Sequence, residues 1–459
     1  MADKKIPTGR VQRLAKVGAA AASQAVKRTG TRAANVGRSG ENADRASERR
    51  QVEAAKQIVT VLGGMKGAAM KVGQVLSFMD VGLVPEQHRE EFQIELAKLR
   101  DSAPTVSFEQ MSEVISDDLG EDLGAIFSDL DPEPIAAASI GQVYRATLKE
   151  GGRDVAVKVQ YPGINDAVRA DLQNLGLIMR LIGRMTPQLD VKALGDEIRG
   201  RIVEELDYEL EASNQRTMAR IYRGHPFIVI PEVVTALSRE RVIVTELVSG
   251  EGFEQIRTEP DEIRDRIGEI VFRFYYGSMF RHRRFSGDPH PGNMIRLPDD
   301  RVAFLDFGLF KSVEPEVTER ELACQRAVIE EDPERLHRLL SEFGFIPEPE
   351  KLAPQVLMDY VVEGIWWYTQ DQTVRLNQKI VSTVAIETSD PRSKHFKAMR
   401  HQDIVPEHIF GRRLELLTLA VLGQLGAEAN WYRIAREWVY GDAPFTELGR
   451  QEAEFYAGR

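Results

Sequence analysis

The sequence contains one cysteine and no long apolar run, and each absence excludes a class of protein. Because Cys324 stands alone, an internal disulfide framework and a cysteine-based metal site are both excluded. No stretch reaches the roughly 18 apolar residues that a membrane-spanning helix needs. Residues 414–427 come nearest but include Glu415 and Gln424, so we expect a buried helix there. Because the N-terminus lacks a signal-peptide apolar segment, the predicted location is cytoplasmic.

The charge is acidic in total and basic at the N-terminus. A net charge of -11 over 459 residues argues against a nucleic-acid-binding protein. Residues 1–50 nevertheless hold 12 Lys and Arg against 4 Asp and Glu. We expect a flexible basic segment over residues 1–52. The alternative is peripheral contact of residues 1–50 with an anionic membrane, although these residues lack the Trp and Phe that anchor such helices.

Apolar spacing predicts most of the secondary structure. Steps of four and three residues predict a helix over about residues 50–80. Ser107 and Gln110 resemble a capping box that opens a further helix. More helices are expected up to about residue 222, followed by short strands around residues 242–248. From residue 251 the chain is expected to be mainly helical, with an interruption at 285–311.

Two strands are expected in the middle of the chain. Residues 143–148 and 154–160 alternate apolar and polar side chains, and Gly151 and Gly152 supply a turn between them. In the second strand the valines share one face, and Lys158 lies on the other. The prolines just before, in DPEP at 131–134, break helix.

Three acidic or amide residues near position 300 complete a pattern that begins at Lys158. Asp288 and Asn293 are five apart in GDPHPGN, and Asp306 precedes Phe-Gly in VAFLDFG. A strand lysine, then Asp-x4-Asn, then Asp-Phe-Gly is the order of parts in a protein-kinase-like site. Any one part is weak evidence, whereas all of them in this order are strong evidence.

Phosphate chemistry explains these residue types. Lys158 supplies a fixed cation for the α- and β-phosphates of ATP. Mg²⁺ takes oxygen ligands, which Asn293 and Asp306 can provide. Asp288 can orient or deprotonate the attacking hydroxyl or water. The predicted cofactors are therefore ATP and Mg²⁺.

Several longer stretches resemble the UbiB/ADCK/AarF family of atypical kinase-like proteins. They are MKVGQVLS, PIAAASIGQVY, VAVKVQYPGI, EELDYELEASN, DPHPGN and LDFG, spread over about residues 55–310. The KxGQ stretch and the alanine-rich loop are specific to that family. The resemblance implies an α+β, protein-kinase-like bilobal fold with an N-terminal helical extension and a helical C-terminal region. The expected segments are 1–52, 53–130 with KxGQ, 131–250 as N-lobe and 251–459 as C-lobe with C-terminal helices.

The resemblance also implies roles for individual residues. Lys158 looks like the catalytic strand lysine, and Glu205 looks like its acidic partner. Glu205 and Asp207 form the ExD element, which is expected to interact with Lys71 and Gln74 of KxGQ in a regulatory role. The alanine-rich loop is expected to hold the nucleotide through Ala136, Ala137, Ala138, Ser139, Ile140, Gly141, Gln142 and Val143. Ala156 is expected to pack against the adenine, with Glu246 and Val248 offering backbone hydrogen bonds.

Plainer interpretations stay open for some of these residues. Glu205 and Lys71 could be ordinary surface charges. His290 is more typical of a residue that braces a loop than of a metal ligand, and the run RHRR at 281–284 suits a helix C-terminus. The sequence also departs from the family at Ser286-Gly287, where His-Ala is common before the catalytic Asp, so bracing of this loop is expected to differ.

Two functions follow from the resemblance. The first is a Mg²⁺–ATP-dependent kinase or ATPase acting on a small molecule or lipid, in isoprenoid quinone (ubiquinone) metabolism, rather than on proteins. The second is a nucleotide-responsive regulatory or chaperone-like binding module with negligible phosphotransfer. Asp288 favours the first, because a pure binder has no need of it. The alanine-rich loop is expected to be stiffer than a glycine loop, because alanine restricts φ.

Overall fold

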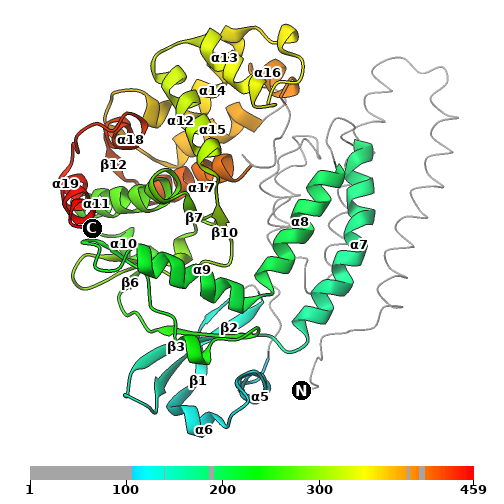
Figure 1. The fold of residues 1–459 in the computed structure, drawn as a ribbon, viewed down its shortest axis with the longest axis vertical. Coiled ribbons are helices and arrows are strands. Elements are labelled where there is room, and N and C mark those ends of the chain that lie inside the picture. Colours follow the sequence, from blue (N-terminus) through cyan, green and yellow to red (C-terminus); the bar gives the residue numbers. More distant parts are fainter. Residues whose placement is uncertain (1–105, 139, 186–190, 390–392, 403–408) are drawn as a thin grey trace, which may run out of the picture. The chain divides into compact units, whose positions relative to one another are not determined.

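The computed structural model describes residues 106–138, 140–185, 191–389, 393–402 and 409–459 (Figure 1). The helix expected over residues 50–80 lies outside them. Two compact units are present. The first comprises the described residues up to Glu209 together with Val234–Val244, and the second comprises Leu210–Val233 and Thr245–Arg459. Each unit is described by itself below, and the four segments expected from the sequence stay predictions.

The first unit is built on a four-stranded sheet in the order β1-β2-β3-β5. Its strands are β1 (Phe127–Ala137), β2 (Gly141–Leu148), β3 (Asp154–Gln160) and β5 (Val242–Glu246), whose last two residues belong to the second unit. The predicted hairpin is confirmed, since β2 and β3 pair antiparallel. Gly151 and Gly152 make its turn at φ of 77° and 61°, a region that favours glycine.

The prolines of DPEP exclude a helix, as expected, and a strand forms there instead. Pro132 and Pro134 lie inside β1 and do not end it. Proline is tolerated in an edge strand, where one row of N–H groups faces away from the sheet. β1 is the edge strand, and its pairing with β2 shifts register between Leu130 and Pro134 and again after Pro134. The edge position and these irregularities explain why a strand survives here.

Helices α5 (Phe108–Leu119), α6 (Leu123–Ile126), α7 (Ile164–Met185) and α8 (Val191–Glu205) complete the first unit. The predicted capping box is confirmed: the Ser107 hydroxyl accepts the N–H of Gln110, whose side chain accepts the N–H of Ser107. At the other end of α5, the Asp118 carboxylate accepts two hydrogen bonds from Arg241, at 2.9 and 3.1 Å, which tie the helix to the residue before β5.

The second unit combines small sheets with many helices (Figure 1). One sheet has the order β4-β9-β8-β6, and β7 pairs with β10 in a separate two-stranded sheet. These strands are β4 (Ile228–Val229), β6 (Glu251–Gly252), β7 (Arg284–Ser286), β8 (Met294–Arg296), β9 (Val302–Phe304) and β10 (Phe310–Ser312). A short third pairing joins β11 (Val374–Arg375) to β12 (Glu428–Ala429).

The helices of the second unit follow the prediction of a mainly helical chain from residue 251. They are α9 (Tyr208–Ile221, from Leu210), α10 (Phe253–Ile256), α11 (Asp261–Phe272), the π-helix η3 (Arg273–His282), α12 (Pro315–Ile329), α13 (Pro333–Glu342), α14 (Pro354–Thr369), α15 (Gln378–Ser389), α16 (Phe396–Arg400), α17 (Ile409–Leu425), α18 (Trp431–Val439) and α19 (Glu447–Ala457). α17 has the buried leucines expected of residues 414–427. No helix in the described part of the chain is long and apolar enough to cross a membrane.

Aromatic rings and one buried arginine join these helices. Trp367 and Trp431 pack edge-on against Phe272, with ring centroids 5.6 and 5.4 Å away. Arg273, fully buried, donates to Glu269 of α11, to Glu437 of α18 and to Glu452 of α19 at 2.7 to 3.0 Å. The start of η3 is thereby fixed to three other helices.

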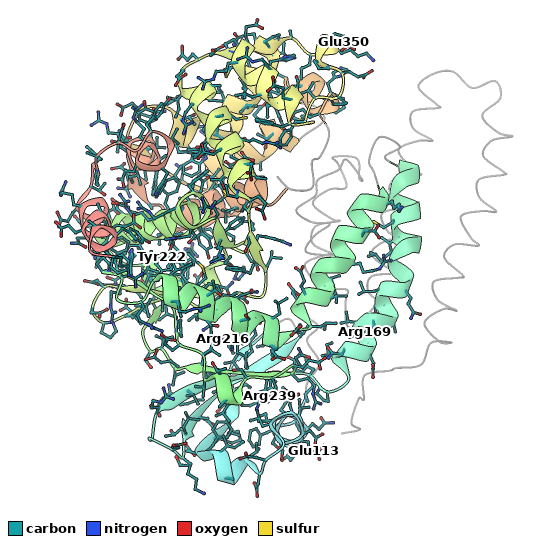
Figure 2. The ribbon with its side chains drawn as sticks, viewed as in Figure 1. Glu113, Arg169, Arg216, Tyr222, Arg239 and Glu350 are labelled. Atoms are coloured by element: carbon teal, nitrogen blue, oxygen red, sulfur yellow. The ribbon has the colours of Figure 1, made fainter. Side chains whose placement is uncertain are left out.

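The end of η3 is a helix C-terminus, as the run RHRR predicted. Arg281 and His282 occupy its last turn, and Arg283 takes a left-handed φ of 54°. The ring of His282 lies edge-on to Tyr222 (labelled in Figure 2), and its Nε2 is 2.8 Å from the Tyr456 hydroxyl. Burial, followed by the charge of Arg281, lowers the pKa of His282 to about 4.

We predict that this histidine makes the second unit sensitive to acid. Because its pKa is depressed on folding, its contribution is present above pH 6.5 and is lost between pH 6.5 and 4 as the unfolded chain takes up the proton. Between pH 7 and pH 4.5, the unfolding free energy of the wild type should fall. In His282→Gln, this fall should be about 2 kcal/mol smaller. All four tryptophans lie in the second unit, so denaturant titrations followed by tryptophan fluorescence measure it. Equal losses in both proteins would contradict the prediction.

Candidate functional site

Two short antiparallel strand pairs of the second unit, β7 with β10 and β8 with β9, position Asp288, Asn293 and Asp306. β7 ends at Ser286 and pairs with β10, and the N–H of Gly287 donates to the Leu309 carbonyl at 2.7 Å. The loop that carries Asp288 therefore starts from a paired strand. The partner strand, β10, begins just after the Asp-Phe-Gly turn. The pairing of β7 with β10 therefore positions both the Asp288 loop and the Asp-Phe-Gly turn.

The hairpin of β8 and β9 brings Asn293 and Asp306 together at its end nearest Met294 and Phe304. β8 begins directly after Asn293 and β9 ends two residues before Asp306, with Met294 opposite Phe304. The Leu305 N–H donates to the Asn293 carbonyl at 3.0 Å, which extends the ladder by one step. Asp306 then turns back on itself, since its Oδ1 accepts the N–H of Gly308 at 2.9 Å.

The loop between Asp288 and Asn293 is braced from within. His290 Nδ1 accepts the N–H of Gly292 at 3.0 Å, and the Asn293 amide donates to the Asp288 carbonyl at 3.4 Å. His290 therefore braces the loop, as expected. The second bond also turns the Asn293 side chain back toward the backbone of Asp288.

Tyr275 supplies a further brace that the sequence did not indicate. It lies fully buried in η3, and its hydroxyl takes a hydrogen bond from the backbone of His290. Burial, and then the charges of Asp288 and Asp306, raise the pKa of Tyr275. One phenol thus lies near both carboxylates and holds the loop between them. Ser286-Gly287 replace the His-Ala common in the family, so a different brace was expected for this loop. Tyr275 can serve as that brace.

Two polar residues of α9, Glu211 and Asn214, also lie near Asp306, and the sequence analysis did not identify them. Glu211 is 4% exposed, and the Asn214 amide donates to the Phe307 carbonyl at 3.2 Å. A Cβ on Gly308 would lie 3.4 Å from Asp306 Oδ1 and 3.5 Å from Glu211 Oε2, so the two carboxylates flank this glycine. The three-residue spacing of Glu211 and Asn214 was the available signal, because it puts both on one helix face.

Asp306 and Asn293 suit Mg²⁺ better than a metal ion whose ligands all come from the protein. The described part of the chain holds no cluster of three or more His, Cys, Asp or Glu arranged for a metal ion. Mg²⁺ in phosphate-transfer sites takes one or two carboxylates, keeps several waters and uses substrate phosphates. Asp306 with Asn293 matches that requirement.

Lys158 is held by the sheet of the first unit. It lies in β3 opposite Val143, and the three valines of that strand are 0–1% exposed on the other face, as predicted. Its ammonium lies 5.0 Å from the ring centre of Tyr208, which is buried. Ala156 shares the face of Lys158 and is half-buried. Tyr208 is a neighbour of the strand lysine that the sequence analysis did not name.

The alanine-rich stretch forms a tight hairpin more than an open loop. Ala136 and Ala137 belong to β1 and pair with Val143 and Gln142. The Ala138 N–H donates to the Gly141 carbonyl at 2.9 Å and closes the turn. Because two of the three alanines are strand residues, the turn itself is shorter than expected.

The other members of this stretch have local structural partners. Ile140 is buried and its carbonyl accepts the Tyr161 N–H, and Gln142 accepts the Tyr144 hydroxyl at 2.6 Å. A Cβ on Gly141 would lie 2.0 Å from the Val159 carbonyl oxygen and 3.1 Å from the Tyr208 hydroxyl oxygen. This close approach to the Val159 carbonyl is what requires glycine at position 141. Ser139 lies outside the described residues.

The ExD element lies where two helices meet. Glu205 is the last residue of α8 and is half-buried, whereas Asp207 is exposed just before α9. Lys71 and Gln74 lie outside the described residues. The pairing of Glu205 with Lys158 and the regulatory role of Asp207 stay predictions.

The segment expected to meet adenine begins at the end of β5. The Glu246 N–H donates to the Glu232 carbonyl at 2.9 Å, so this donor is already bonded within the protein. Val248 lies in the irregular segment after β5. The expected backbone contacts of Glu246 and Val248 with adenine stay predictions.

Comparison with known proteins agrees with this geometry. The model of the ABC1 atypical kinase-like domain matches residues 98–340, more than half of the chain. Atypical kinase COQ8B, mitochondrial, of Rattus norvegicus is 30% identical over 64% of this chain and 54% of its own length. Protein ACTIVITY OF BC1 COMPLEX KINASE 1, chloroplastic, of Arabidopsis thaliana is 32% identical over 68% and 45%. The chain thus spans about half the length of these curated relatives.

One solved structure extends the comparison to most of the chain. It is the Rv3197–erythromycin complex from Mycobacterium tuberculosis, with 30% identity and a TM-score of 0.63 over 88% of this chain and 100% of the other. This neighbour and the family match confirm the kinase-like α+β fold predicted from the sequence.

We predict that the Tyr275 hydroxyl keeps the Asp288 loop ordered. Tyr275→Phe retains the ring but loses the hydrogen bond to His290, so the second unit should lose about 1 kcal/mol of unfolding free energy. Hydrogen exchange of the amides in residues 288–293 should become faster. The matched control is Tyr222→Phe, which loses a hydroxyl contact of 2.7 Å to Ser278 elsewhere in the unit. Similar loop exchange in both variants would exclude a specific role for Tyr275.

Proposed function

Because the chain belongs to the ABC1 atypical kinase-like family, we propose that it binds Mg²⁺–ATP and uses it as a kinase or ATPase. The observation that carries this proposal is the joint placement of Asp288, Asn293 and Asp306 by two antiparallel strand pairs and Tyr275. A chain that only bound nucleotide would not need Asp288 beside the metal-binding pair. ATP and Mg²⁺ would supply the transferable phosphoryl group and the charge that neutralises it.

Apart from Lys71 and Gln74, which lie outside the described residues, the proposed roles fall on positions given above. Asp306 and Asn293 would hold the metal ion, and Asp288 would orient the attacking hydroxyl or water. Lys158 would pair with phosphate oxygens, where the nearby Tyr208 ring limits the freedom of its side chain. Gly141 would keep the turn close against β3, where the Val159 carbonyl leaves no room for a Cβ. Glu205, Asp207, Lys71 and Gln74 would form the regulatory contact that the family resemblance implies.

We propose a small molecule or lipid as substrate, in isoprenoid quinone metabolism, rather than a protein. The support is the KxGQ extension of the family, whose residues lie outside the described part of the chain. Contact of residues 1–50 with an anionic membrane is part of the same proposal. Flotation with liposomes, with and without these residues, tests it: equal flotation of both forms would sink this role of the basic segment.

The rival function, a nucleotide-responsive regulatory or chaperone-like binder, has one observation in its favour. The turn at Ala138 is closed by its own hydrogen bond to Gly141, which leaves fewer backbone N–H groups for phosphates than an open glycine loop would.

Turnover of ATP in Asp288→Asn separates the two functions. Under the kinase or ATPase proposal, the variant should lose roughly 100-fold or more of Mg²⁺-dependent turnover, measured with lipid and phenol-like additives, because the base is removed. ATP affinity should stay within about twofold, since the folded scaffold is retained. Glu350→Gln, an exposed position labelled in Figure 2, is the control and should match the wild type. A wild type that binds ATP yet is as inert as Asp288→Asn under every condition would establish the binder.

Nucleotide preference should respond to the alanine turn. Ala138→Gly frees φ at the residue whose N–H closes the hairpin, so more phosphate geometries become accessible. We expect ATP or ADP affinity, or their ratio, to change by about threefold or more in equilibrium titrations. Unchanged affinities for both nucleotides would count against a phosphate role of this turn.

A further inference from the structure

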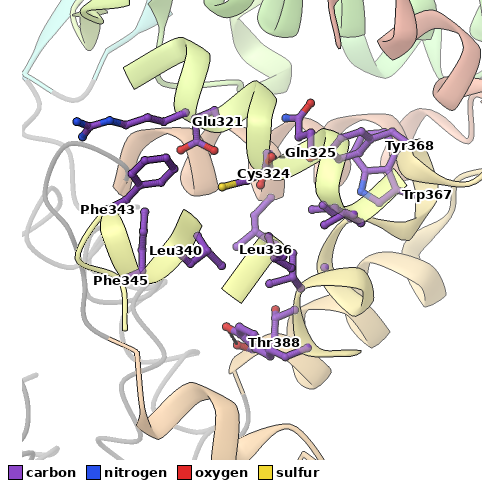
Figure 3. Close-up of a pocket in the computed structure, with 18 of the residues that line it drawn as sticks. Glu321, Cys324, Gln325, Leu336, Leu340, Phe343, Phe345, Trp367, Tyr368 and Thr388 are labelled. Carbon is purple, nitrogen blue, oxygen red and sulfur yellow. Dashed lines mark hydrogen bonds between the residues drawn. The ribbon is translucent and has the colours of Figure 1, made fainter. Parts of the chain in front are cut away.

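A cavity in the second unit lies apart from every residue assigned to nucleotide above. Its volume is about 170 Å³, and its walls come from α12, α13, α14, α15 and α17 (Figure 3). An engineered protein cavity of roughly 150 Å³ is large enough for benzene. The space therefore suits one ring or a short branched chain.

Most of the wall is apolar. Leu336 and Leu340 of α13 face the space together with the rings of Phe343 and Phe345 (Figure 3). Trp367 closes another part of the wall and is 1% exposed. A ligand must therefore bring an apolar body.

One polar group in this wall lacks a partner. Gln325 of α12 is only 4% exposed, and its Oε1 makes no hydrogen bond to any residue that the structure describes. A buried carbonyl without a hydrogen bond destabilises the folded chain, and a ligand donor would remove that cost. Figure 3 shows Glu321, Cys324 and Gln325 following one another along the wall that α12 supplies.

The cavity also carries negative charge. Glu321 and Glu415 line it, and Glu415 accepts the Tyr368 hydroxyl at 2.6 Å. Burial raises the pKa of the Cys324 thiol to about 12, and the charge of Glu321 adds to this while Arg335 opposes it. Arg320 is the one cation that the described residues place in the wall. It is exposed and lies 4.9 Å from the ring centre of Phe343. Gln325 is thus buried and the two carboxylates are half-buried, whereas the cation is near solvent.

We propose that this cavity binds a small organic cation, an amine attached to a single ring or short branched chain. The amine would donate to Gln325 Oε1 within the field of Glu321 and Glu415, and its apolar body would contact the leucine and phenylalanine side chains. The proposal is independent of the nucleotide function, because none of the nucleotide residues lines this cavity.

Titration calorimetry with three probes of one size tests the ligand class. Benzylamine should bind saturably and at least about tenfold more tightly than benzyl alcohol, because a charged donor gains more from a buried acceptor and two carboxylates. Benzoate should not bind. Absence of benzylamine binding, or benzoate binding as tight as that of benzylamine, would overturn the proposal.

Two variants locate the binding. A Cβ on Gly364, which lines the cavity, would meet only Thr388 Cγ2, at 3.4 Å, so Gly364→Met can extend into the space and should abolish binding. Gln325→Leu keeps a similar volume without the carbonyl and should weaken benzylamine about tenfold. Its melting temperature should stay equal or rise, because an unsatisfied buried group is removed. Wild-type benzylamine affinity in Gly364→Met, or in a folded Gln325→Leu, would show that the amine binds elsewhere.

Discussion

The chemistry proposed for the second unit depends on backbone pairing at the edges of two loops. Asp288 and Asp306 each follow a three-residue strand, and such short strands hold position only because each is paired. The Gly287 N–H to Leu309 carbonyl bond and the Leu305 N–H to Asn293 carbonyl bond are the last rungs of those ladders. Beyond them, the side chains of His290 and Asp306 close their own turns, so the loop geometry is set by hydrogen bonds made within a few residues.

The far C-terminus supports the same loops through η3. Arg273 opens this π-helix and is fixed by Glu437 of α18 and Glu452 of α19. Two residues later comes Tyr275, which reaches the backbone of His290. Breaking a buried ion pair leaves an uncompensated charge, which costs several kcal/mol. The ion cluster therefore fixes, from one side, the helix from which the Asp288 loop is braced.

The alanine turn of the first unit, which we propose to contact phosphate, is fixed by close approach and not by a flexible loop. At Gly141 the Val159 carbonyl leaves no room for a Cβ, and at Ala138 the turn is closed by a hydrogen bond. Both features reduce conformational freedom. Under the proposed function, such a turn would admit fewer phosphate arrangements than a glycine loop.

The sequence by itself determined the hairpin of β2 and β3, the capping box at Ser107, the buried helix α17 and the order of the site residues, because period, turn glycines and motif spacing are local properties. It did not determine strand β1, since only pairing at a sheet edge lets Pro132 and Pro134 remain in a strand. Nor could it identify Tyr275, Glu211 or the amide of Gln325. Their roles depend on which side chains meet after folding, and contacts between residues far apart in the chain leave no periodic signal in one sequence.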